Sequence, residues 1–175
     1  MKRLLFVFSL GLCASALAEP PYVDEDDPYA LPPWVESDYT LPAYPKDENL
    51  VEFNVDGAPN LKAYVDKTAI GAGTPDSVIR YILVVKTNGG AVNVSYEGVR
   101  CDTSEYRIYA TGTLEKTWSK ARVSEWRRFK IYNQAQKSLA NNYFCPNFVP
   151  IGSAREGLNA LREGVHPAVG RRNYF

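Results

Sequence analysis

The stretch that decides the fold reads SVIRYILVVK at residues 77–86, TNGG at 87–90 and AVNVSYEGV at 91–99. β-Branched and aromatic residues fill the first part, and apolar and polar residues alternate in the last part, as in paired strands. The Asn88-Gly89-Gly90 sequence between them favours a tight turn. The segment therefore predicts an antiparallel β-hairpin.

Shorter strand-like segments flank this hairpin at residues 50–55, 62–66 and 105–112. Sequential strands with turn signals between them are typical of an antiparallel meander. Beyond Leu114 the apolar spacing becomes helical over residues 132–144. A second helix is expected after the capping box Ser153-Ala154-Arg155-Glu156, with its end at Gly164. We expect an α+β domain with a small antiparallel sheet of four to five strands and two short helices.

The N-terminus has the layout of a secretory signal peptide. Lys2 and Arg3 precede an apolar run at residues 4–12, and small residues lead to Ala18. Cleavage is expected between Ala18 and Glu19, which places the mature chain in the periplasm. Lipidation at Cys13 is the alternative, although Leu12 before it is larger than a lipoprotein signal prefers. No later segment is long and apolar enough to span a membrane.

The mature chain divides into an arm (19–49), one domain (50–165) and a C-terminal tail (166–175). The arm holds seven of the twelve prolines and has nine acidic residues against one base, a net charge of −8, whereas residues 50–175 carry a net charge of +6. Proline blocks regular structure, but tyrosines and a tryptophan recur along the arm. The arm is either a solvated spacer or a docked strap, and we favour partial docking. A further hypothesis places its acidic residues on the basic face of the domain.

Two cysteines remain after cleavage, Cys101 and Cys145. In an oxidising compartment an even pair predicts a disulfide bond, and a loop this long gives roughly 4 kcal/mol of stabilisation. Free thiols or a metal pair are the alternatives, but His166 is the one histidine, so a zinc site lacks ligands. The bond would tie the first helix to the sheet.

Residues around these cysteines resemble a known family. The features are Cys101, the segments 105–110 (EYRIYA) and 143–146 (YFCP), and the residues Trp118 and Trp126 between them. As a set they resemble the cryptic neisserial protein-like family, small periplasmic proteins of Gram-negative bacteria with no assigned activity. The resemblance implies export and brings no catalytic residues with it.

Familiar catalytic and cofactor motifs are missing from the sequence. No nucleophile elbow, phosphate loop or dinucleotide fingerprint occurs, and no cofactor is expected. His166 falls in the tail, where we expect it to be exposed. Paired carboxylates can cleave glycosidic bonds. The candidate acids in the domain are Glu97, Asp102, Glu105 and Glu125.

Residues 100–137 hold nine bases against four acids, with aromatic residues among them. Bases and aromatic rings together suit an anionic ligand, which in the envelope is a glycan or a lipid head group and not nucleic acid. The candidate binding face is Arg107, Trp118, Arg122, Trp126, Arg127 and Arg128. The alternative is a solvated basic surface with its tryptophans in the core. We expect a non-catalytic envelope binding or structural module, and the alternative is a hydrolase acting on an envelope polymer through carboxylates.

Overall fold

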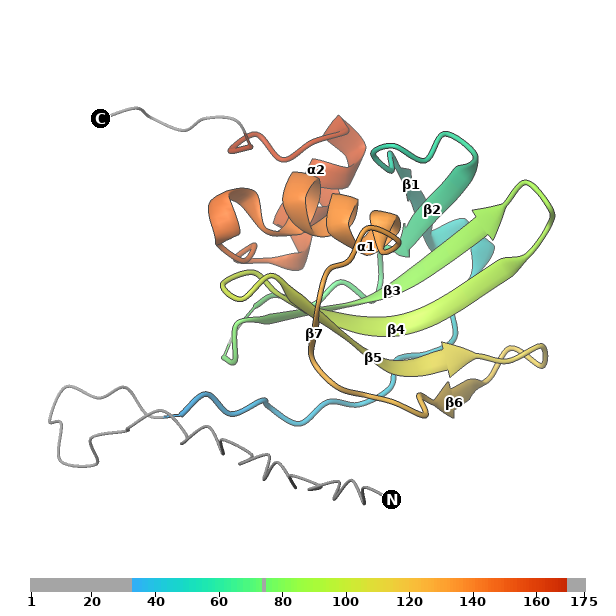
Figure 1. Ribbon diagram of the computed structural model, residues 1–175, viewed down its shortest axis with the longest axis horizontal. Helices are drawn as coiled ribbons and strands as arrows, with labels where there is room; N and C mark the ends of the chain where they lie inside the picture. The colour runs from blue at the N-terminus through green and yellow to red at the C-terminus, as the bar shows by residue number, and fades with distance from the viewer. Residues whose placement is uncertain (1–32, 74, 170–175) are drawn as a thin grey trace, which may run out of the picture. The chain divides into compact units, whose positions relative to one another are not determined.

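The computed structural model describes residues 33–73 and 75–169 (Figure 1). Seven strands form one antiparallel sheet in the order β1-β2-β3-β4-β5-β6, and β7 also pairs with β5. The strands are β1 (Leu50–Phe53), β2 (Leu61–Asp66), β3 (Val78–Thr87), β4 (Val92–Arg100), β5 (Glu105–Gly112), β6 (Trp118–Lys120) and β7 (Arg127–Arg128). The predicted signal peptide, Cys13 and residues 19–32 of the arm lie outside the described residues. Among the helices that are described, none has the length and apolarity to cross a bilayer.

The α+β class is confirmed, but the sheet has more strands than the four to five expected. The additional strands are β6 and β7, with three and two residues. Strands this short carry no readable alternation, so residues 115–130 have the sequence appearance of a basic loop. They pair with opposite halves of β5, which is the longer strand at this edge.

The β3–β4 hairpin forms as expected and contributes side chains to both faces of the sheet. Gly90 has a φ of +82° in its turn and donates its N–H to the carbonyl of Thr87 at 2.9 Å. Along β3, Tyr81 and Leu83 belong to one apolar cluster and Ile82 to the other. Both faces are buried around β3, which explains why its sequence is almost continuously apolar.

The helical segments cover one face of the sheet (Figure 1). They are α1 (Gln134–Leu139), the π-helical turn η2 (Ala140–Phe144), the 3₁₀ turn η3 (Pro146–Phe148) and α2 (Ala154–Glu163); a further 3₁₀ turn, η1 (Asp47–Asn49), precedes β1. The helix expected over 132–144 therefore begins as α-helix and widens from Ala140, whose carbonyl accepts the N–H of Cys145 five residues later at 2.7 Å. Leu139 and Phe144 pack with Ile79 and Tyr81 in the main core.

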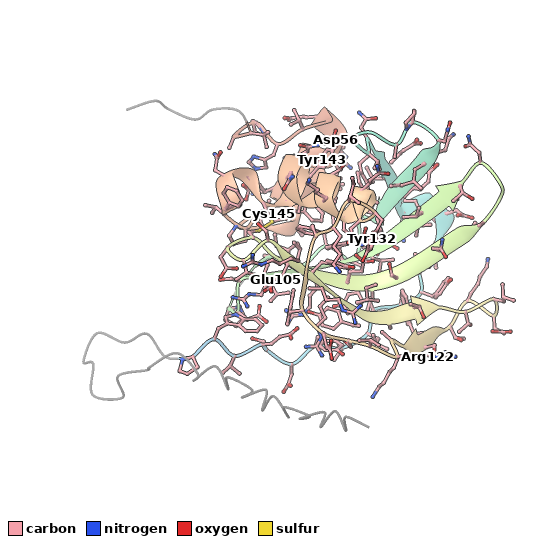
Figure 2. The ribbon with its side chains drawn as sticks, in the orientation of Figure 1. Asp56, Glu105, Arg122, Tyr132, Tyr143 and Cys145 are labelled. Atoms are coloured by element: carbon pink, nitrogen blue, oxygen red, sulfur yellow. A yellow bond between two sulfur atoms is a disulfide. The ribbon has the colours of Figure 1, made fainter. Side chains whose placement is uncertain are left out.

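The structure contains the expected disulfide bond between Cys101 and Cys145, whose Cα atoms lie 5.3 Å apart. Cys101 directly follows β4, and Cys145, labelled in Figure 2, directly follows η2. Both residues belong to the main core. The bond therefore connects the helical layer to the sheet.

The end of the chain packs more closely than its composition indicates. Helix α2 begins as expected, because Ser153 Oγ accepts the N–H of Glu156 at 3.2 Å, but the Glu156 carboxylate accepts from Gly152 and not from Ser153. Gly164 ends the helix at a φ of +80°. The expectation that His166 is exposed is wrong: 6% of it is accessible, and its Nε2 lies 3.0 Å from the Glu156 carboxylate.

The other face of the sheet carries a smaller apolar cluster that includes Ile82, Val84, Tyr96 and Tyr109. Residues 34–46, here called the strap, run along this side, away from the helices (blue in Figure 1). The Tyr39 ring lies 4.2 Å from the ring of Tyr109, measured between centroids. This part of the arm is therefore docked on the domain in extended form.

Candidate functional site

The strap is attached to the sheet along its length by hydrogen bonds as well as by rings. The Trp34 indole donates to the carbonyl of Asp76 at 2.8 Å, and the backbone N–H of Ser37 donates to the Asp76 carboxylate at 2.9 Å. Further along, the Trp118 indole donates to the carbonyl of Pro42 at 2.8 Å. Each of these bonds joins residues that are far apart in the sequence. They therefore determine where the strap lies on the domain rather than its local conformation.

The Glu36 carboxylate is the centre of these contacts. Its Oε2 accepts from the Arg107 guanidinium at 2.5 Å and from the Trp126 indole at 3.0 Å. Its Oε1 accepts from the Tyr109 hydroxyl at 2.5 Å and from Arg80 at 3.3 Å. The side chain is only 13% exposed. Four donors thus converge on one carboxylate, and charge-assisted hydrogen bonds of this kind are the strong ones.

A second carboxylate, that of Asp76, brings the charge of the site to two acids against the two arginines, Arg80 and Arg107. Asp76 accepts from the Arg80 guanidinium at 2.7 Å, and Arg80 also donates to the carbonyl of Ser37 at 3.1 Å. Arg80 therefore connects Asp76, the strap backbone and Glu36. Buried charges are tolerated when they are paired and hydrogen-bonded in this way.

The register of the sheet explains why the two arginines meet. Arg80 of β3 lies opposite Gly98 of β4, and Gly98 lies opposite Arg107 of β5. Side chains directly opposite one another share a face of the sheet. A Cβ at Gly98 would collide with the hydroxyl of Tyr109. The glycine leaves the space into which Tyr109 extends toward Glu36.

The electrostatics of the site favour ionised carboxylates and a neutral tyrosine. Burial acts to raise the pKa of Glu36, but hydrogen bonds from Tyr109 and Trp126 and the charge of Arg107 lower it overall. Burial also acts to raise the pKa of Asp76, but the hydrogen bonds from Arg80, Ser37 and Val78 and the charge of Arg80 together lower it. Burial and the neighbouring Glu36 raise the pKa of Tyr109 well above its usual value. The tyrosine thus stays a hydrogen-bond donor.

Tryptophan rings border the site on its outer side. The Trp34 ring meets Trp126 edge to face at 5.9 Å between centroids, and the Arg100 guanidinium lies 3.9 Å from the centre of the Trp34 ring. Contacts of this type add to the ion pairs when they are shielded from water. The site therefore holds the Glu36 carboxylate together with the ring of Trp34, two residues before it.

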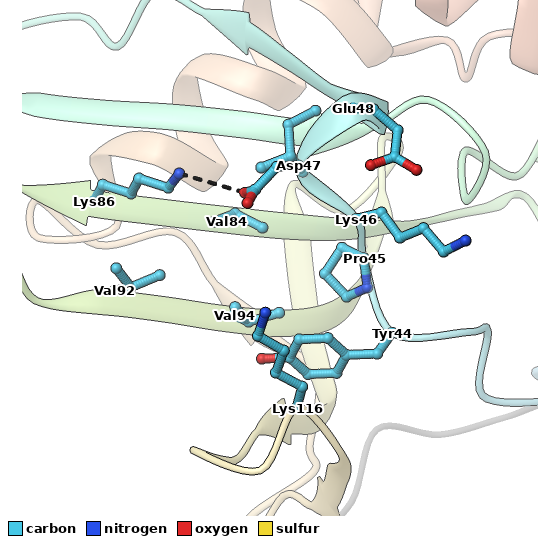
Figure 3. Close-up of a pocket in the computed structure, with 11 residues that line it drawn as sticks. Tyr44, Pro45, Lys46, Asp47, Glu48, Val84, Lys86, Val92, Val94 and Lys116 are labelled. Atoms are coloured by element: carbon cyan, nitrogen blue, oxygen red, sulfur yellow. Dashed lines mark ion pairs between the residues drawn. The ribbon is translucent and has the colours of Figure 1, made fainter.

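A pocket of about 610 Å³ opens where the strap ends (Figure 3). Val84 and Val94 form part of its wall, and Tyr44 lies at its border. Three lysines line it, at positions 46, 86 and 116, and Lys86 pairs with Asp47 at 3.8 Å. Asp47 and Glu48 line it as well, so the pocket at the end of the strap has a border of mixed charge.

A family model matches residues 29–162, a range that includes the strap, all seven strands and nearly all of α2. The chain belongs to the CNP1-like family. It is a family of uncharacterised proteins, and the resemblance to cryptic neisserial protein-like proteins is compatible with it. No curated protein and no solved structure matches the chain. The function of this CNP1-like chain therefore has to be argued from its geometry.

The structure divides the candidate face predicted from sequence into two groups. Arg107, Trp118 and Trp126 all contact the strap. Three arginines, at positions 122, 127 and 128, are exposed, and Arg122 lies in the loop after β6 (Figure 2). Arg127 lies 3.7 Å from the exposed carboxylate of Glu125. The tryptophans are partly covered by the strap and are neither free nor fully in the core.

Sequence reasoning missed Glu36, Arg80 and Asp76 as members of the site. One signal was present: Arg80 is a charged residue within the apolar run 77–86, where a buried charge requires a partner. Glu36 is one of nine acidic residues in the arm, and nothing in the sequence of the arm distinguishes it from the other eight. The pairing of strap and sheet is a long-range contact that no local pattern encodes.

The acids considered for hydrolysis have different surroundings. Glu97 is buried, and its carboxylate accepts from Ser95 at 2.6 Å. Asp102 and Glu105 both lie near Arg100, at 3.0 and 3.9 Å, and Glu125 is exposed. Across residues 33–73 and 75–169, no three metal-binding side chains come together.

Proposed function

We propose that the protein is an exported, periplasmic module of the cell envelope that binds an acidic partner and catalyses no reaction. Export is supported by the N-terminal sequence, and an oxidising compartment is supported by the disulfide bond between Cys101 and Cys145. Binding is supported by the site that holds Glu36.

The observation that carries the proposal is the convergence of Arg80, Arg107, Tyr109 and Trp126 on one carboxylate of the strap. The donors come from β3, β5 and the loop between β6 and β7, whereas the acceptor lies on an extended segment. The strap is thus an intramolecular ligand. A partner with a carboxylate and a neighbouring aromatic ring on an extended chain satisfies the same donors when the strap leaves.

The exposed arginines extend the surface that such a partner meets. Arg127 and Arg128 form β7 directly after Trp126, and Arg122 lies shortly before it. Among the described residues, neither Arg122 nor Arg128 has an ion-pair partner. Unpaired surface charges of one sign attract an oppositely charged partner and speed its association. They would contact the acidic residues next to the carboxylate that replaces Glu36.

The hydrolase alternative receives less support from the geometry. Glycoside hydrolysis requires two carboxyl groups on opposite sides of one bond, one of them kept protonated. Glu97 is a buried carboxyl with a raised pKa, because burial outweighs its hydrogen bonds from Ser95, Gln136 and Tyr81. Among the described residues that line the cavity beside it, Glu97 is the single carboxyl, so no second one faces it there.

The binding proposal is tested with a fluorescent peptide of residues 33–46 added to the mature chain. The strap competes in cis at an effective concentration in the mM range for a short linker, so a variant with a weakened strap, Trp34→Ala/Glu36→Gln, is used as receptor. We expect this receptor to bind the peptide at least tenfold more tightly than the wild type does, and a peptide carrying Glu36→Gln at least tenfold more weakly.

The control receptor is Val35→Ala/Asp38→Asn, which changes two exposed strap residues and should behave as the wild type. Equal binding of the unmodified peptide and the peptide carrying Glu36→Gln would refute carboxylate recognition. Export is tested separately, by mass spectrometry of the protein from a periplasmic fraction. A mature N-terminus at Glu19 is expected, and a chain that retains Met1 contradicts export.

A further inference from the structure

A second cavity lies on the helix-covered side of the sheet, away from the strap. Its volume is about 390 Å³, and it is formed by β3, β4 and β5 together with the start of α1. Eight of its lining residues are polar: Asn93, Ser95, Glu97, Thr111, Tyr132, Asn133, Gln134 and Gln136. A cavity of this size lies within the usual range for small-molecule sites. We call it the amide cleft.

Glu97 organises the amide cleft from beneath. Its side chain is 1% exposed, and its carboxyl accepts from Ser95 at 2.6 Å and from the Gln136 amide at 3.2 Å. Tyr81 donates to the other oxygen at 3.2 Å from within the core. A buried carboxyl with several partners fixes the side chains that contact it, so Ser95 and Gln136 are positioned before any ligand arrives.

The charge of the lining distinguishes this cleft from the strap site. Among the described residues, no lysine, arginine or histidine lines it, and Glu97 is its single acid. Hydroxyls and side-chain amides both donate and accept hydrogen bonds. Val85 and Ile108 add apolar surface, and the ring of Tyr132, labelled in Figure 2, is 72% exposed at the rim.

We propose that the amide cleft is a binding site for a neutral oligosaccharide. Sugar hydroxyls match the amides and hydroxyls of the lining, and the apolar faces of sugar rings match Val85, Ile108 and the exposed Tyr132 ring. An anionic ligand would find no cation among the described residues that line the cleft. The cleft shares no lining residue with the Glu36 site, and its ligand goes beyond the acidic partner proposed above.

The test is an NMR titration of the ¹⁵N-labelled mature protein with maltotriose and with chitotriose. Saturable shifts at Ser95, Ile108 and Gln136 are expected for at least one of these sugars. Tyr132→Ala should weaken that binding at least fivefold, and Asn93→Ala should weaken it as well. Ile131→Ala is the matched control, because Ile131 is 88% exposed and does not line the cleft, and it should leave the affinity unchanged.

Four results would overturn the assignment. Shifts confined to other surfaces would leave the cleft without a neutral sugar ligand. So would the absence of saturable shifts with either sugar up to about 20 mM, a concentration well above a Kd of 1 mM. If Ile131→Ala and Tyr132→Ala lower the affinity for the sugar equally, the Tyr132 ring has no specific role in binding. A glucosamine trimer is cationic. If it binds far more tightly than both neutral sugars, the cleft is a site for an amine that pairs with Glu97.

Discussion

Glu36 and Arg107 lie 71 positions apart in the sequence, and the Glu36 carboxylate accepts a hydrogen bond from the Arg107 guanidinium at 2.5 Å. This contact joins an acidic, proline-rich arm to the basic half of the chain. It pairs one acid of the arm with one base of the sheet.

Glu36→Gln should loosen the strap without unfolding the domain. The amide retains some hydrogen bonds but leaves Arg107 without a charged partner and Arg80 with Asp76 alone, and the cost is about 1–3 kcal/mol. We expect faster hydrogen exchange in the strap, including at the Ser37 amide, while β3 and β4 remain protected. Asp38→Asn makes the same charge change at an exposed strap position and should leave exchange unaltered. Matching rates in the two variants would be inconsistent with the site described here.

Acid should release the strap, because the pKa values of Glu36 and Asp76 are lowered in the folded state. A lowered folded pKa gives stability that is present above the unfolded value and is lost as pH falls through the folded value. The loss should therefore develop below pH 4.5, the ordinary pKa of a glutamate. The free energy of unfolding, measured from pH 7 to pH 2.5, should fall less steeply for Glu36→Gln than for the wild type. Parallel curves would exclude Glu36 as a contributor.

Glu97 should give a pH dependence of the opposite sign. Burial raises its pKa above 4.5, so the folded state binds a proton that the unfolded state releases. Stability is then complete below pH 4.5 and declines as pH rises through the folded pKa. Glu97→Gln removes this decline. The free energy of unfolding of the variant, measured by chemical denaturation, should therefore rise relative to that of the wild type between pH 4.5 and pH 8. A difference between the two proteins that does not change with pH would contradict the raised pKa.

Gly98→Ala should displace Tyr109 and weaken its hydrogen bond to Glu36. The added Cβ collides with the Tyr109 hydroxyl, which has to move away from Glu36. Overpacking of this kind costs about 1–3 kcal/mol, and the strap should exchange faster as a result. Gly89→Ala in the β3–β4 turn is the control, since its Cβ meets one atom at an ordinary 3.8 Å. If both variants melt at the wild-type temperature, Gly98 is not required for the position of Tyr109.

Much of this fold is encoded locally. A few neighbouring residues predict the β3–β4 hairpin, the cap at Ser153 and the end of α2 at Gly164. The number of cysteines predicts the pairing of Cys101 with Cys145. The short strands β6 and β7 do not, because two or three residues carry no periodicity.

The candidate site was only partly accessible from sequence. Aromatic and basic enrichment located Arg107 and Trp126, since both chemistries are visible in composition. Glu36 and Arg80 required the sheet register, which places Arg80 and Arg107 on either side of Gly98. The burial of His166 likewise depends on its contact with Glu156, after the helix has ended.

The central claim is that the sheet holds a carboxylate site that the strap occupies. The most direct test is a double-mutant cycle between the strap peptide and the Trp34→Ala/Glu36→Gln receptor, with Glu36→Gln in the peptide and Arg107→Gln in the receptor. Close charge pairs couple by at least about 1.5 kcal/mol, and we expect a value in that range. A coupling energy below about 0.5 kcal/mol, the scatter of independent positions, would show that Arg107 does not recognise the carboxylate.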